Sequence, residues 1–89
     1  MVKFIENSGE SFENAIVIQG VGHNFEGLGA ENRYLEEKYG PRGKDWVPEQ
    51  VLVAKDGKFY DIVELNFLNG KSKTLYFDIS DFYRKWQER

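Results

Sequence analysis

The 89-residue chain contains no cysteine, so disulfide bonds, thiolate nucleophiles, iron–sulfur clusters and cysteine-based zinc sites are excluded. It has no stretch near the roughly 18 consecutive apolar residues that a membrane-spanning helix needs. Residues 1–7 also lack the apolar run of a secretory signal. We therefore expect a cytoplasmic protein with no membrane segment.

Positive charge is scarce as well. Twelve Lys and Arg against fifteen Asp and Glu give a net charge of −3, whereas a general nucleic-acid binder needs a basic footprint for phosphates. The only basic cluster, Lys55, Lys58, Lys71 and Lys73, flanks two predicted turns. With nearby tyrosines such a cluster can stack bases, but lysines beside turns usually protect sheet edges. We expect no nucleic-acid partner.

What the chain does contain is typical of a globular protein. Hydrophobic residues make up 40% and charged residues 30%, with seven Phe, five Tyr and two Trp to fill a core. Ordinary domains span about 100–150 residues and shorter chains rarely divide. We expect one domain over residues 1–89, with no cofactor and no metal.

The pattern of apolar residues predicts an α+β fold with a mainly antiparallel sheet. Turn signals at 56–57 and 69–70 (Asp-Gly and Asn-Gly) separate three strand-forming runs, which predicts a three-stranded meander over about 47–77. The β-branched run 15–19 predicts one further, central strand. Helices are predicted at 30–39, which ends before Gly-Pro, and at 80–88, which carries an apolar stripe.

If both turns are two-residue hairpins, Val53 lies opposite Tyr60 and Ile62 lies opposite Phe77. This register makes both faces of the meander apolar. One face carries Val51, Val53, Tyr60, Ile62, Leu75 and Phe77, and the other carries Leu52, Ala54, Phe59, Val63, Leu65, Phe67 and Tyr76. Either the N-terminal strands and the 20–29 loop cover one face, or a bulge rotates the pattern, or one face binds a partner.

Residues 20–29 contain four glycines and are predicted to form a loop between a strand and a helix. A dinucleotide fingerprint would need a small residue at Phe25, and a phosphate-binding Walker loop would need lysine at Leu28. Both motifs therefore fail. Free backbone N–H groups near Gly29 remain able to attract a small anion, and the glycines otherwise serve only the turn.

His23 is the only histidine, and Glu26 and Glu31 follow it. An imidazole with two carboxylates can hold a divalent metal or form an acid–base pair, although loop spacing fixes no geometry. The candidate ligand-binding residues are therefore Gly22, His23, Glu26, Gly29 and Glu31. No Ser–His–Asp arrangement is recognisable.

The strand residues Asp61 and Glu64 fall among apolar neighbours in the expected register. Such a carboxylate either has a raised pKa and acts as an acid or lies at a wetted strand edge.

The leading hypothesis is a small, non-catalytic protein of unknown function that acts through contacts with an unidentified protein or with itself. Its candidate interaction residues are the sheet aromatics Tyr60, Phe67 and Tyr76. The alternative is a small-ligand or anion-binding domain, or a minor enzyme, that uses the 20–29 loop and His23.

Overall fold

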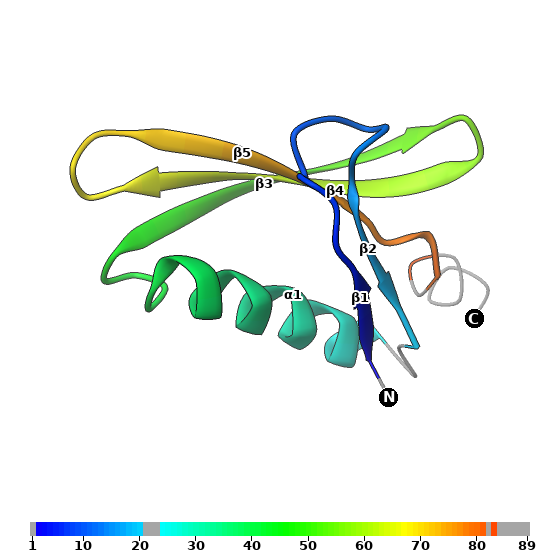
Figure 1. Cartoon of the computed structure of the whole chain (residues 1–89), viewed down its shortest axis with the longest axis horizontal. Helices are drawn as coiled ribbons and strands as arrows, with labels where there is room; N and C mark the ends of the chain where they lie inside the picture. Colours follow the sequence, from blue (N-terminus) through cyan, green and yellow to red (C-terminus); the bar gives the residue numbers. More distant parts are fainter. Residues whose placement is uncertain (1, 21–23, 82, 84–89) are drawn as a thin grey trace.

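The computed structural model describes residues 2–20, 24–81 and 83, and side chains at these positions other than 24–28. In this part of the chain five strands form one sheet and one helix packs on it (Figure 1). The elements are β1 (Lys3–Ile5), β2 (Ile16–Gln19), α1 (Asn24–Tyr39), β3 (Trp46–Lys55), β4 (Lys58–Phe67) and β5 (Ser72–Asp78).

The sheet is mixed rather than purely antiparallel, with the strand order β1-β2-β5-β4-β3. β2 pairs in parallel with β5, and the other three neighbouring pairs are antiparallel. The strand predicted at 15–19 is confirmed as β2, between β1 and β5, where Ile16 and Ile18 are buried. No helix in the described residues is long and apolar enough to cross a membrane.

The first predicted hairpin is confirmed. Asp56 and Gly57 both have positive φ, 52° and 78°, as a two-residue type I′ turn requires. Lys55 therefore lies opposite Lys58, and the pairing continues without interruption to Trp46 opposite Phe67.

The second hairpin has a three-residue loop instead of the predicted two. The Phe67 amide donates to the Lys71 carbonyl at 2.9 Å, which leaves residues 68–70 as the loop. Gly70 has a φ of 87°, the left-handed conformation that such loops require at their last position. The Asn-Gly signal thus identifies the turn but not its length.

The additional loop residue places Ile62 opposite Tyr76, so the predicted pairing of Ile62 with Phe77 is wrong. A one-residue shift turns every β5 side chain to the other face. The face that packs against α1, called the inner face, buries Ile16, Ile18, Trp46, Val63, Leu65, Leu75 and Phe77. The opposite, outer face carries both apolar and charged residues, and Leu75 and Phe77, which the predicted register had placed on it, lie on the inner face.

The outer face is covered in part by the segment between β1 and β2. Phe12 makes edge-to-face contacts with Tyr60 and Tyr76, each with 4.9 Å between ring centroids. The Lys55 ammonium lies 4.8 Å from the Phe12 ring centroid. The cover therefore comes from this segment, whereas β1 and β2 themselves extend the sheet.

Helix α1 begins at Asn24, six residues before the predicted start, so most of the expected 20–29 loop is helical. Glycine disfavours a helix by about 1 kcal/mol, but packing overrides this preference because Ala30, Tyr34 and Leu35 are buried against the sheet. The predicted end is confirmed, since Gly40 follows the helix with a φ of 95°.

The helix predicted at 80–88 lies largely outside the described residues. Ser80, Asp81 and Tyr83 have helical backbone, and the Tyr83 amide donates to the Ile79 carbonyl at 2.9 Å. The Asp78 carboxylate accepts a hydrogen bond from the Ser80 amide at 3.0 Å, as at a helix start. Only α1 is established as a helix of several turns.

Replacing Trp46 by alanine is expected to lower the free energy of unfolding by about 3–5 kcal/mol, measured by urea denaturation. Trp46 is fully buried, and its indole N–H donates to the Gly40 carbonyl at 2.7 Å. The control is Val47→Ala, one residue along β3 on the outer face and 50% exposed, with an expected change below about 1 kcal/mol. Equal losses in both variants would contradict the assigned faces.

Candidate functional site

The structure describes only part of the residue set proposed from the glycine-rich segment. Gly22 and His23 lie outside the described residues, and Glu26 lies on α1 with no described side chain. Gly29 is exposed, with open space where a Cβ would stand. Because Gly29 lies inside α1 and not at its start, its N–H is used within the helix and the anion site expected there is not formed. Of this set, only Glu31 lines a described pocket.

Glu31 belongs to a cluster of three polar side chains from three elements: Glu31 of α1, Gln50 of β3 and Asp61 of β4. Both acids are almost fully buried, with 3% and 2% of their surface exposed, while Gln50 is exposed at the sheet edge. The Gln50 amide nitrogen donates to Glu31 Oε1 at 3.1 Å and to Asp61 Oδ2 at 2.8 Å. One amide group therefore joins both carboxyl groups.

This carboxyl pair changes the protonation of Glu31. Burial raises the pKa of Glu31 well above its ordinary value of 4.5, and the Asp61 carboxyl raises it further by hydrogen bonding and by charge. The hydrogen bond from Gln50 acts in the opposite direction on the same pKa. Glu31 consequently keeps its proton at pH values where an exposed glutamate is ionised, and it can act as a hydrogen-bond donor.

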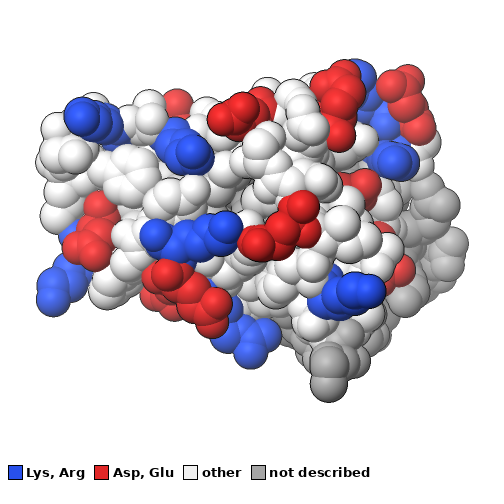
Figure 2. Space-filling model, viewed as in Figure 1, with Lys and Arg blue, Asp and Glu red and all other residues white. Residues whose placement is uncertain are grey.

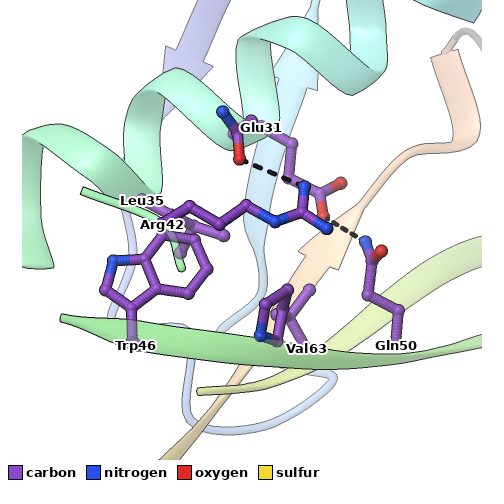
Figure 3. Close-up of a pocket in the computed structure, with 8 residues that line it drawn as sticks. Glu31, Leu35, Arg42, Trp46, Gln50 and Val63 are labelled. Atoms are coloured by element: carbon purple, nitrogen blue, oxygen red, sulfur yellow. Dashed lines mark hydrogen bonds between the residues drawn. The ribbon is translucent and has the colours of Figure 1, made fainter. Parts of the chain in front are cut away.

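A pocket of about 160 Å³ lies beside this cluster, between α1 and the sheet (Figure 3). Its apolar walls and polar rim are formed by Glu31, Asn32, Leu35, Arg42, Trp46, Pro48, Gln50 and Val63. Figure 3 shows the Arg42 side chain extending across the pocket toward Glu31, where its Nη1 donates to Asn32 Oδ1 at 3.4 Å. The space is sufficient for a few water molecules or one very small organic molecule.

The Glu31 carboxyl group in this pocket can hold and exchange a proton. No serine, threonine, tyrosine or histidine is among its described lining residues, so no hydroxyl or imidazole stands beside the carboxyl pair. Two oxygens, Glu31 Oε2 and Asp61 Oδ1, are buried without a hydrogen-bond partner in the described part of the chain. A small polar molecule that enters the cluster would supply hydrogen-bond partners to these two oxygens.

The three aromatic residues proposed for interaction do not share one surface. Tyr60 and Tyr76 lie on the outer face beneath Phe12, and Tyr60 is only 7% exposed. Phe67 points to the inner face, where its ring centroid lies 5.9 Å from that of Tyr39. The predicted register had placed Tyr76 on the face of Phe67, whereas the structure places it on the face of Tyr60.

Exposed apolar residues lie instead on β3, one of the two edge strands of the sheet. Val47, Val51 and Leu52 are 50%, 60% and 55% exposed. In an antiparallel pair, backbone groups alternate between pointing to the partner strand and away from it. Counting from Lys55 at the type I′ turn, the residues whose N–H and C=O point outward are Gln50, Leu52 and Ala54. No described residue hydrogen-bonds these groups, which we call the free edge.

Sequence reasoning identified Glu31 for a different site and singled out Asp61 for its apolar surroundings. It missed Gln50 and the exposed β3 residues. The strand order that makes β3 an edge is not visible in the local pattern of β3, but an acid within an apolar strand was a usable signal for the carboxyl pair.

Comparison with known proteins adds no identification, since no family model, curated protein or solved structure matches the chain. The functional argument therefore depends on the carboxyl pair, the pocket and the free edge of β3.

The unfolding free energy is expected to decrease as the pH rises above about 4.5. The unfolded chain releases the Glu31 proton near that pH, while the folded protein holds it to higher pH. Between these two pKa values the slope is about −1.4 kcal/mol per pH unit. Glu31→Gln, which has no proton to release, should remove this slope in urea denaturation at several pH values. The exposed Glu37→Gln is the control, and an unchanged slope in Glu31→Gln would refute the assignment.

Proposed function

We propose that this chain is a non-catalytic, cytoplasmic protein that acts through protein contacts, and that its contact surface is the free edge of β3. The observation that carries the proposal is the combination, on one edge strand, of unpaired backbone groups with the exposed side chains of Val51 and Leu52. Edge strands bind partners by adding a strand, in which backbone hydrogen bonds give affinity and alternate side chains give specificity.

Two of the devices that protect sheet edges are found at the beginning of β3. Pro48 has no N–H to offer, and the segment before the strand is tied to it by the Gly43 amide, which donates to the Trp46 carbonyl at 2.7 Å. From Gln50 onward neither device is present in the described residues. The second half of β3 is therefore the part that a partner can reach.

Other features support binding rather than chemistry. The carboxyl pair has no hydroxyl or imidazole beside it among the described lining residues. Acidic and basic side chains are interspersed on the face seen in Figure 2, which is unlike the basic stripe of a nucleic-acid binder.

A second candidate function, binding of a small ligand in the pocket, is favoured by the unpartnered Oε2 of Glu31. A small compound that carries both a donor and an acceptor group would supply a partner for this oxygen of the protonated carboxyl group. Small amines such as imidazole and ethanolamine are the probes. A rise in melting temperature that is lost in Glu31→Gln supports this function, and no rise with any amine opposes it.

The contact surface is tested by placing the photo-crosslinking residue p-benzoylphenylalanine at position 52 or, as control, at the exposed position 37 of α1. In extracts of the source cells, we expect discrete adducts of higher mass from position 52 and none from position 37. Absence of adducts at position 52, or the same adducts from both positions, would refute a contact through β3.

A further inference from the structure

We propose that the partner at the free edge is a second copy of this chain, paired β3 to β3 in antiparallel orientation with Leu52 opposite Leu52 of the second copy. This inference rests on the proposed contact through β3 and names its partner. The product is a symmetric dimer in which two five-stranded sheets join into one continuous sheet.

The backbone of the free edge is self-complementary about Leu52. With the two-fold axis at this residue, Gln50 pairs with Ala54 of the second copy and Ala54 pairs with its Gln50. All three residues have outward N–H and C=O groups, so every free group finds a partner and about six backbone hydrogen bonds form.

Obstacles at the beginning of β3 select this register. Centring the axis on Gln50 would bring the 56–57 turn of the second copy against the segment that the Gly43–Trp46 hydrogen bond holds beside β3. Centring it on Ala54 would place Leu52 opposite Asp56 in that turn of the second copy, leave Gln50 without a partner in β3 and shorten the pairing. Leu52 is the centre that uses the whole free edge and avoids the closed end.

Charges on the outer face match in the same register. Within one chain, Glu49 lies directly opposite Glu64, and Lys55 directly opposite Lys58. Like charges in such pairs destabilise a sheet. Pairing about Leu52 places Glu49 opposite Lys55 of the second copy, twice by symmetry. Glu64 and Glu49 of one chain then lie in line with Lys55 and Lys58 of the second copy. Opposite charges therefore meet where the two sheets join.

Apolar side chains lie at the centre of the interface, between the two Glu49–Lys55 pairs. Val51 lies opposite Val53 of the second copy on the outer face, and the two Leu52 side chains meet on the inner face. Val51 and Leu52 are 60% and 55% exposed in the single chain, so pairing covers the two exposed large apolar side chains of the second half of β3. An apolar centre flanked by charges is the usual composition of a specific interface.

The opposite edge of the sheet is a poor alternative occupant. β1 has three residues, Lys3–Ile5, and cannot match the length of the free edge. Contact between β3 and β1 of different copies would also be head-to-tail, which builds rings or filaments rather than a symmetric pair. A two-fold β3 pair uses the same surface on both copies and stops at two.

Charge reversal tests the pairing in solution. Sedimentation equilibrium of the wild-type protein should show a concentration-dependent mass approaching about twice 10.4 kDa. Glu49→Lys and Lys55→Glu should each weaken association by about tenfold, because each puts like charges opposite one another. The double variant restores opposite charges and should restore association, and the melting temperature of each variant verifies folding. A wild-type chain that stays monomeric at about 1 mM, or a double variant weaker than both single variants, would overturn the dimer.

A cysteine pair tests the register independently, because the native chain has no cysteine. In the proposed pairing the two Leu52 Cα atoms are about 5.5 Å apart, within disulfide range, whereas the two Val51 Cα atoms are about 8 Å apart. Leu52→Cys should therefore form a disulfide-linked dimer under mild oxidation much faster than Val51→Cys. Equal rates would overturn the register.

The two proposals can fail separately. If the purified protein is monomeric but the probe at position 52 crosslinks to other proteins, self-pairing is wrong and the contact function of β3 stands. If position 52 gives no adduct of any kind and the protein is monomeric, both are wrong.

Discussion

The pairing of β4 with β5 is the constraint on which the rest of the structure depends. Gly70, with its φ of 87°, closes a three-residue loop and sets Val63 opposite Leu75. With that register, Val63, Leu65, Leu75 and Phe77 share the face that packs against α1, and Tyr60, Ile62 and Tyr76 share the outer face. Asp61 lies on the same strand and face as Val63, so it also points inward, toward Glu31. The length of a single turn therefore decides which β5 residues complete the core around this acid.

Gln50 connects this buried cluster to the exposed edge of the sheet. Its side chain reaches inward and donates to Glu31 and Asp61, while its backbone groups point outward from β3. Two carboxyl groups close together are unfavourable unless one keeps its proton or a donor bridges them, and here Glu31 keeps its proton and the Gln50 amide bridges both. An edge residue held by two hydrogen bonds loses little further freedom when a partner strand arrives, which is the benefit of preorganisation.

The sequence predicts those elements whose signals are local. The Asp-Gly turn requires positive φ at two positions and determines the β3–β4 register, and Gly40 marks the end of α1. The start of α1 was missed because buried Leu35 and its neighbours outweigh the low helix propensity of Gly27 and Gly29. The exposed edge and the carboxyl pair depend on strand order and on contacts between distant segments, which no local pattern contains.

An exposed apolar edge strand can pair with other chains and cause aggregation. The residues along β3 therefore indicate how its pairing is restricted. On β3 the exposed apolar residues occupy the middle of the free edge, and Glu49 and Lys55 stand at its two ends. Slipping the paired strands by two residues would move Glu49 opposite Val53 in one direction or opposite Gly57 in the other. Either slip loses both Glu49–Lys55 charge pairs. The charges thus favour one antiparallel register over its neighbours, and the closed segment before Pro48 limits extension at the other end. Such an edge is suited to a single defined partner strand rather than to open-ended stacking.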